Sequence, residues 1–156
     1  MEPLIRLTRR RLVLGDLVAA AKFGTFIPID DPVREEQILA AIARTAEAIG
    51  VDAALSRRFF AAQIEANKAV QRGLHALWAE EPGRRPARSP DLQGEVRPRL
   101  DRLNRAILHG MRTAELPLRL PGTRTGGRTD PVARLHESAL LTALAPLAHQ
   151  RHSRRG

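Results

Sequence analysis

The sequence predicts an all-α fold, a single-domain bundle of about five to six helices. Ala and Leu dominate the hydrophobic residues, which make up 43% of the chain, and both favour helices over sheets. Apolar residues recur at three- and four-residue spacing through several long stretches. No alternating Val/Ile/Thr-rich run is long enough to predict a strand. A length of 156 residues suits one domain with a real core rather than two.

The first two expected helices are separated by a short loop. One covers about residues 4–22 and ends at Gly24, a residue type common after helix C-termini. Its apolar face consists of Leu4, Leu7, Leu14, Leu17, Val18 and Ala21. The second begins at Asp31 and Pro32, a capping acceptor followed by proline at the first position, and runs to Gly50.

Three further helices follow. A long one spans residues 52–80, and its apolar stripe is Leu55, Phe59, Ala62, Ala66, Val70, Leu74 and Leu77. After a Pro/Gly-rich loop, a fourth helix covers about residues 92–113, with Pro98 in its first turns or kinking it, and with Leu100, Leu103 and Ile107 facing inward. Asp130 and Pro131 start a last helix that reaches about His149.

These elements suggest one domain over residues 1–156. We expect the catalytic helices within about residues 4–110, a helical extension over about 111–150 and a basic tail at 151–156. Residues 116–130 form a second irregular, Gly/Pro-rich segment. The extension is expected to cover the bundle or to build an interface.

The net charge of +9 favours an anionic partner, such as nucleic acid, an acidic membrane surface or a small anionic substrate. Nine arginines fall in expected loops or the tail, where a solvated basic surface is the simplest interpretation: Arg84, Arg85, Arg88, Arg119, Arg124, Arg128, Arg151, Arg154 and Arg155. The absence of cysteine excludes disulfides and thiolate metal sites. The histidines lack metal-ligand spacing, so we interpret them as surface or structural: His75, His109, His136, His149 and His152.

The basic, then apolar, N-terminal segment could be mistaken for a signal peptide. Asp16 interrupts its apolar part and the helical periodicity continues through it, so we assign it to the fold. If the protein is exported, its signal is expected to be absent from this chain. No apolar run reaches the 18 residues that would suggest a membrane-spanning helix.

Polar residues on three of the expected helices suggest a binding pocket. Arg11 and Lys22 are eleven residues apart, three helical turns, so they share one face at about 16 Å separation along the axis. Arg34 lies in the first turn of the second helix, and Asn67 and Gln71 are one turn apart on the third. Because an unpaired buried charge is costly, such cations need a counter-charge. A ligand with several negative oxygens would supply it.

The order and spacing of these residues resemble the all-helical AroQ-class chorismate mutases. The resemblance rests on Arg11, Lys22, Asp31, Arg34, Glu35 and the segment "QIEANKAVQ", and covers about residues 5–108. The segment "DLQGEVRPRLDRLN" after a Pro-rich loop, and Trp78 near the end of the long helix, are similar to the exported, monofunctional gamma subclass. The resemblance implies conversion of chorismate to prephenate.

The resemblance also implies a role for each site residue. Arg11 and Arg97 would hold substrate carboxylates, and Lys22 would bond both a carboxylate and the ether oxygen. The remaining positions match as follows: Arg34 at the other end of the substrate, Asp31 and Glu35 near its hydroxyl, Asn67 where the family usually has Ser or Thr, and Gln71 facing the ether oxygen.

Four features bear on the match to the family pattern. Ile38 stands where some relatives have a polar residue, and the cysteines of some exported members are absent. Pro98 directly follows Arg97 and affects the local backbone. Asn67 can still donate a hydrogen bond in place of a hydroxyl.

The expected reaction is a pericyclic Claisen rearrangement, which needs no proton transfer, nucleophile, metal or cofactor. The protein has to hold the substrate in a near-attack conformation and stabilise negative charge on the breaking ether. By resemblance we expect a homodimer with each active site within one chain, in the periplasm or secreted.

Two alternatives remain open from sequence. An isochorismate–pyruvate lyase would share the scaffold and the cationic pocket, although such lyases usually lack a C-terminal extension. A basic helical protein that binds nucleic acid would fit the charge, but the chain lacks aromatic stacking residues and a recognisable binding motif. Residues 8–11, "TRRR", are predicted to be a helix face with Arg11 turned inward rather than a nucleic-acid patch.

Overall fold

A computed structural model of the chain describes residues 2–114, 116, 122 and 130–148. These ranges hold five α-helices and no strand, which confirms the predicted all-α fold. The helices are α1 (Glu2–Lys22), α2 (Pro32–Ala48), α3 (Ala53–Glu80), α4 (Arg97–Thr113) and α5 (Pro131–Ala148). The basic tail and most of the irregular segment 116–130 lie outside the described residues.

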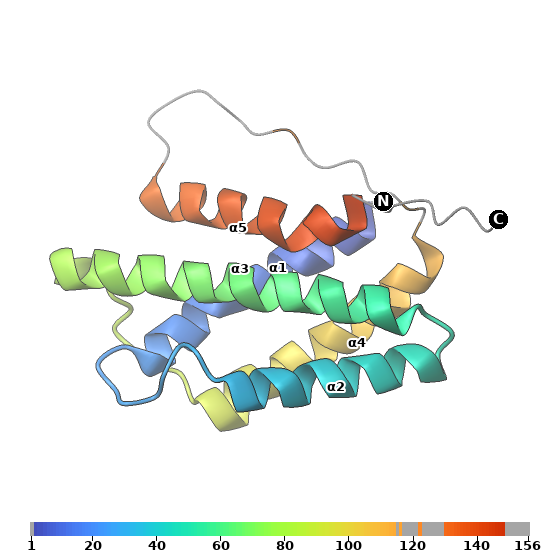
Figure 1. The fold of residues 1–156 in the computed structure, drawn as a ribbon. Helices are drawn as coiled ribbons and strands as arrows, with labels where there is room; N and C mark the ends of the chain where they lie inside the picture. The colour runs from blue at the N-terminus through green and yellow to red at the C-terminus, as the bar shows by residue number, and fades with distance from the viewer. Residues whose placement is uncertain (1, 115, 117–121, 123–129, 149–156) are drawn as a thin grey trace.

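The long helix α3 is the centre of the bundle (Figure 1). It packs against α1, α2 and α5, while α4 packs mainly against α1. Within the described part of the chain, every helix is too short or too polar to cross a bilayer. Four helices, α1 to α4, therefore surround the space where the predicted site residues lie, and α5 covers the opposite side of α3 and α1.

The predicted helix starts are confirmed by their capping bonds. Asp31 Oδ1 accepts a hydrogen bond from the Arg34 backbone N–H at 3.1 Å, and Asp52 Oδ1 accepts one from Leu55 at 2.8 Å. Asp130 Oδ2 accepts from the backbone N–H of Val132 at 3.2 Å. The first of these caps fixes the start of α2, where three of the predicted site residues cluster.

The entry to α4 is more complex than a simple helix start. Leu92–Val96 forms one π-helical turn (η2), and α4 then begins at Arg97, with Pro98 in its first turn as predicted. A short 3-10 turn (η1, Pro82–Arg84) follows α3. This path returns the chain across the bundle and places Arg97 at the N-terminus of α4.

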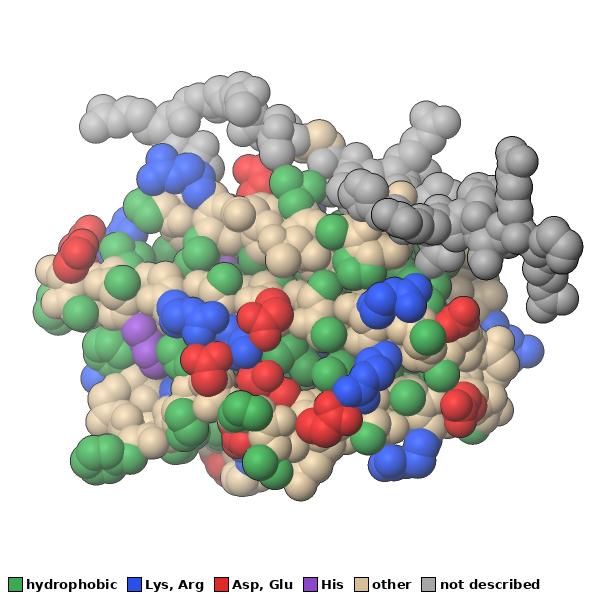
Figure 2. All heavy atoms as spheres, in the orientation of Figure 1, with side chains coloured by type: hydrophobic (Ala, Val, Ile, Leu, Met, Phe, Trp, Pro, Cys, Tyr) green, Lys and Arg blue, Asp and Glu red, His purple; other side chains and the backbone are tan. Residues whose placement is uncertain are grey.

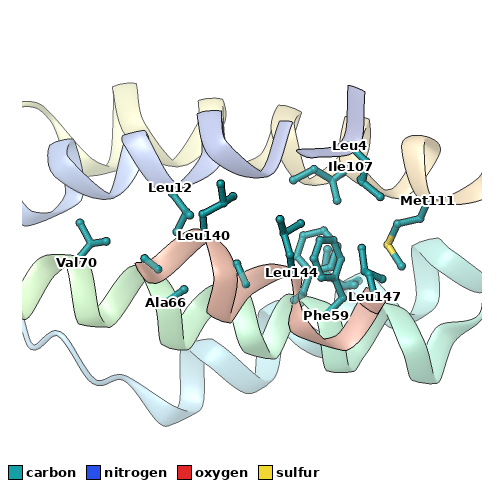
Figure 3. Packing of buried hydrophobic residues seen from close by; sticks show 14 of the residues in the cluster. Leu4, Leu12, Phe59, Ala66, Val70, Ile107, Met111, Leu140, Leu144 and Leu147 are labelled. Atoms are coloured by element: carbon teal, nitrogen blue, oxygen red, sulfur yellow. The ribbon is translucent and has the colours of Figure 1, made fainter. Parts of the chain in front are cut away.

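The core fills the space between α3 and the other helices. Phe59 and Phe60 of α3 are fully buried, and α1, α4 and α5 add buried side chains such as Leu12, Ile107 and Leu144 to the same cluster (Figure 3). Burial of each such side chain contributes roughly 1.5–3 kcal/mol. The C-terminal extension therefore supplies part of the core through α5.

Close approach of α5 to α3 depends on a glycine. A Cβ placed on Gly73 of α3 would lie 2.6 Å from Cδ2 of Leu135 on α5, well inside van der Waals contact. The lone glycine inside the long helix thus marks the contact with the C-terminal helix.

Candidate active site

A cavity of about 110 Å³ opens between α1, α2, α3 and α4. Seven of the eight predicted site residues line it: Arg11, Lys22, Asp31, Arg34, Glu35, Asn67 and Gln71. Lys68 and five apolar residues, Val18, Ile29, Ile38, Ile64 and Leu100, complete the lining. Arg97 is not among the lining residues. Side chains up to 89 positions apart in the sequence, Arg11 and Leu100, therefore meet at one place.

Arg11 is the most deeply buried cation of the site, with 5% of the residue exposed. Its Nε donates a 2.8 Å hydrogen bond to Asn104 Oδ1, whereas its Nη1 is buried without a hydrogen-bond partner among the described residues. Burial lowers the pKa of Arg11 to about 10, and Asp101 opposes this shift. Arg9 and Arg10 are exposed whereas Arg11 is buried, which confirms the prediction that Arg11 turns inward.

Lys22 lies at the C-terminal end of α1 among several charges. Burial lowers its pKa, Arg97 and Arg34 lower it further, and Asp31 and Glu35 oppose the effect. Burial also lowers the pKa of Arg97, with a further contribution from Arg34. Arg97 is therefore close enough to the two lining cations to interact with them electrostatically, although it does not line the cavity.

Three cations converge here, Lys22, Arg34 and Arg97, and none of them has a carboxylate partner among the described residues. No ion pair joins Lys22 or Arg34 to another residue in the described ranges. The Glu35 carboxylate, which also lines the cavity, pairs with Lys68 rather than with either of these cations, at 3.2 Å. An anionic ligand would reduce the repulsion between Lys22, Arg34 and Arg97.

Lys68 is the lining residue that sequence reasoning missed. Only 10% of its side chain is exposed, and its Nζ lies 2.7 Å from Glu65, 3.0 Å from Asp30 and 3.2 Å from Glu35. Burial by itself would lower the pKa of Lys68, but hydrogen bonds to these three carboxylates outweigh burial and raise it. The signal was present in the sequence, since Lys68 is four residues after Ile64 and three before Gln71, on the same helix face.

The two amides of the site are bonded to each other. Gln71 Nε2 donates to Asn67 Oδ1 at 3.0 Å, while the buried Gln71 Oε1 has no hydrogen-bond partner among the described residues. Gly15 of α1 packs directly on the Asn67 amide, since a Cβ there would lie 2.9 Å from Oδ1. The side chain of Asn67 is thus held between α3 and α1.

The two carboxylates of the site lie at the start of α2. Asp31 caps the helix, and Glu35 Oε1 accepts a 3.3 Å hydrogen bond from the Asp31 backbone N–H. This reciprocal pair resembles a capping box, but with the glutamate at the fourth helical position instead of the third, and both residues line the cavity. Among the described residues no group of three or more His, Asp or Glu side chains could hold a metal ion.

The chemistry available to this lining is electrostatic. Arg11, Lys22 and Arg34 can bind anionic oxygens, and the Gln71 amide can donate a hydrogen bond. The lining contains no serine, histidine or cysteine that could act as a nucleophile. Preorganised donors in a partly buried cavity are suited to stabilising charge that develops within a bound anion.

The fold and the cavity define a class of protein: an all-α bundle with a cation-lined cavity between its first four helices. The sequence profile described as chorismate mutase type II matches residues 2–72. The chain also superposes on the crystal structure of chorismate mutase from Burkholderia phymatum with a TM-score of 0.73 and 30% identity, covering 95% of both chains. The protein belongs to this family, the all-helical AroQ chorismate mutases.

Relatives from other bacteria support the same assignment. The chain is 37% identical over 106 residues to a secreted chorismate mutase of Mycolicibacterium smegmatis, a match that covers 68% of this chain and 58% of the relative. It is 33% identical over 105 residues to the secreted chorismate mutase of Mycobacterium tuberculosis, covering 67% of this chain and 52% of the relative. This chain thus spans a little over half the length of the curated relatives it matches.

Proposed function

We propose that this chain is a chorismate mutase, an isomerase that rearranges chorismate to prephenate. The observation that carries the proposal is the cavity itself, in which buried cations and paired amides from three helices meet without enough carboxylates to neutralise them. Chorismate is a dianion, so its carboxylates would supply the missing counter-charge. The family, and the chorismate mutases to which this chain is similar, favour the same activity.

The proposed mechanism depends on positioning and charge. Arg11 binds one carboxylate through its unpaired Nη1, and Lys22 contacts a carboxylate and the ether oxygen. Arg34 binds toward the other end of the substrate, with Arg97 assisting from the start of α4. Together these contacts hold the enolpyruvyl side chain over the ring in a near-attack conformation. No group in this scheme transfers a proton.

The ether oxygen gains negative charge as its C–O bond breaks. In our proposal Lys22 and the Gln71 amide donate hydrogen bonds to this oxygen, and Asn67 contributes the second amide. Asp31 and Glu35 lie near the substrate hydroxyl. Donors fixed before the reaction stabilise the transition state more than the ground state, which is how they raise the rate.

The test is the loss of chorismate absorbance on adding the purified protein, repeated with Lys22→Ala. Removal of one such donor costs about 3–4 kcal/mol of transition-state stabilisation, a loss of roughly a hundred- to a thousandfold in kcat. Helical circular dichroism should be unchanged because Lys22 is at a helix end and half-buried. Wild-type turnover in the variant would refute the role of Lys22.

An assay with isochorismate as a second substrate distinguishes the two enzymatic activities considered for this fold, mutase and lyase. If isochorismate is cleaved to pyruvate and chorismate is not rearranged, the protein is a lyase and the mutase assignment fails. We further propose that residues 1–156 act as one catalytic domain, that the protein is a homodimer with each site inside one chain, and that it works in the periplasm or as a secreted protein. The names of the secreted relatives support the last point.

A further inference from the structure

A second cavity lies between α1 and α4, apart from the proposed active site. It measures about 520 Å³ and shares no lining residue with the site cavity. Its floor is apolar, formed by Leu7, Val13, Leu14, Leu103 and Ala106. Four arginines complete the lining, Arg9 and Arg10 from α1 and Arg99 and Arg102 from α4. We call it the α1–α4 groove.

The arginines of this groove lack the partners that arginines have elsewhere in the bundle. On the face shown in Figure 2, acidic and basic side chains lie next to one another over α2 and α3. Arg57 pairs there with Glu36, and Arg72 with Asp30. Within the described residues none of the four groove arginines forms an ion pair, and no carboxylate lines the groove.

Gathering four like charges at one place is unfavourable unless something offsets them. Exposed arginines on separate surfaces would need no explanation, but these four face one apolar floor from two helices. Val13 adds to that floor an apolar side chain that is 48% exposed. An amphipathic anion would satisfy both features, because its body would cover the floor and its charges would meet the arginines.

The size of the groove limits the ligand. The lining runs over residues 7–14 of α1 and 99–106 of α4, about 10 Å along each helix axis. That length suits a small organic molecule. A helix of a partner protein could place only about two turns in the groove. A second copy of this chain placed on the groove about a two-fold axis would bring the same arginines against each other. Bases of a nucleic acid usually stack on aromatic side chains, and no aromatic residue lines the groove.

We propose that the α1–α4 groove is a second ligand site, which binds a small organic dianion with an apolar or aromatic body. Arginines on one helix bind one anionic group, and arginines on the other helix bind the second. The proposal does not depend on chorismate mutase activity, since no residue of the site cavity takes part.

The experiment uses bis-anilinonaphthalene sulfonate, a dianionic aromatic dye whose fluorescence rises in apolar surroundings. Titration into the full chain should give saturable binding at a single site, and neutral phenylnaphthylamine should bind much more weakly. The double variant Arg10→Glu/Arg102→Glu should weaken dye binding by at least about tenfold, because two charge-assisted contacts become repulsive.

A matched control carries the same change of net charge away from the groove. Arg44 and Arg58 are exposed on α2 and α3 and line neither cavity, so Arg44→Glu/Arg58→Glu should alter dye affinity less than about twofold at physiological salt. Lys22→Ala should bind the dye as the wild type does. Val13→Asn, which removes apolar floor without changing charge, should weaken binding. If the charge-reversed variant fails to fold, Arg10→Gln/Arg102→Gln replaces it.

Several results would overturn the proposal. Equal weakening in the groove variant and the control would mean that only net charge matters. Loss of binding in Lys22→Ala would place the dye in the site cavity. Equally tight binding of the neutral dye would mean an apolar surface without anion selectivity. A change from dimer to monomer in Arg10→Glu/Arg102→Glu would show that a second copy of the chain occupies the groove.

Discussion

The Gln71 amide nitrogen donates a 3.0 Å hydrogen bond to Oδ1 of Asn67, one turn earlier on α3. An amide NH₂ has two hydrogens, so this bond leaves one N–H free for a ligand. Both residues are buried, with 4% and 7% of their surfaces exposed, and both line the site cavity. Asn67 therefore fixes which end of the Gln71 amide is the nitrogen, and with it the donor we assign to the ether oxygen.

Replacing Asn67 with Ala should lower kcat about 5–30-fold, the value of one lost hydrogen bond of 1–2 kcal/mol in the transition state. KM should change less, because the carboxylate contacts of Arg11 and Lys22 remain. Asn67→Thr restores a side-chain oxygen that can accept from Gln71, so it should recover most of kcat. Steady-state kinetics on the three proteins measures the effect. Equal activity of Asn67→Ala and wild type would show that Gln71 needs no such partner.

Gly15→Ala should reduce activity without reducing stability. The new Cβ would lie 2.9 Å from Asn67 Oδ1, so the amide has to shift, and kcat/KM should fall by about tenfold, comparable to loss of its hydrogen bond. Alanine is also about 1 kcal/mol more favourable than glycine in a helix interior. This gain offsets the strain of the close contact, so the melting temperature should not fall.

Two companion variants of Gly15→Ala make the result interpretable. Gly110→Ala is the matched control, since its Cβ would lie 3.4 Å from Leu4, an ordinary contact, and activity should be unchanged. In Gly15→Ala/Asn67→Ser the shorter side chain leaves room for the methyl group, so the two changes should be non-additive. Strict additivity would contradict contact between Gly15 and Asn67 as the cause.

The pH dependence of the reaction depends on which groups titrate. Gln71 does not ionise, so wild-type kcat/KM should be flat between about pH 5 and 8. Its alkaline decline should begin below 10.5, the ordinary pKa of lysine, because burial and the nearby Arg97 and Arg34 lower the pKa of Lys22. Lys22 is needed in its charged form, so activity is lost as pH rises.

Gln71→Glu should make kcat/KM depend on whether the new carboxyl group is protonated. A carboxyl group at this position donates only when protonated, so kcat/KM should fall by about tenfold for each pH unit above its pKa. Profiles measured between pH 4.5 and 9 on both proteins test this. A profile that is unchanged by the substitution would mean that residue 71 does not donate to the reacting atoms.

The helices and their boundaries were largely readable from the sequence, because each signal is local. Apolar periodicity gave the five helices, and Asp31, Asp52 and Asp130 gave three of their starts. The one-turn π-helical segment before Arg97 was not predicted, since it depends on how the return loop packs. The role of Gly73 in α5 docking also needs the tertiary contact with Leu135.

Part of the site could also be predicted from the sequence, because helical spacing is a local signal. Cations and amides at helical spacing predicted a shared pocket, the family resemblance added Asp31, Glu35 and Arg97, and seven of these eight residues line one cavity. Lys68 escaped because lysine usually extends to solvent, and only the fold brings Asp30, Glu35 and Glu65 around it. The pairing of Gln71 with Asn67 was equally hidden, because it depends on the side-chain rotamers that Gly15 permits.

Lys68→Met should raise KM by about tenfold with a smaller change in kcat. Without Lys68 the Glu35 carboxylate, whose side chain is 23% exposed, loses the one ion pair it forms among the described residues, and its freed negative charge at the cavity repels a dianionic substrate. Stability should fall by about 1–3 kcal/mol, the cost of leaving a largely buried charged group unpaired. Lys68→Met/Glu35→Gln removes the repulsion and should recover the KM. No recovery would mean that Lys68 itself contacts the substrate.

A pH-dependent contact joins α5 to α1. His136 Nε2 lies 2.7 Å from Asp16 Oδ1, and this hydrogen bond raises the pKa of His136 above 6.5 although burial opposes it. A raised folded-state pKa stabilises the fold fully below the unfolded value, and the contribution is lost as pH rises through the folded value. His136→Gln should therefore lower the melting temperature by about 2–4 °C at pH 5.5, for a contribution near 1 kcal/mol, and by less at pH 8.5. The exposed His109→Gln serves as the control and should show no such pH-dependent difference. An equal loss for His136→Gln at both pH values would mean that the pair acts as a neutral hydrogen bond rather than as an ion pair.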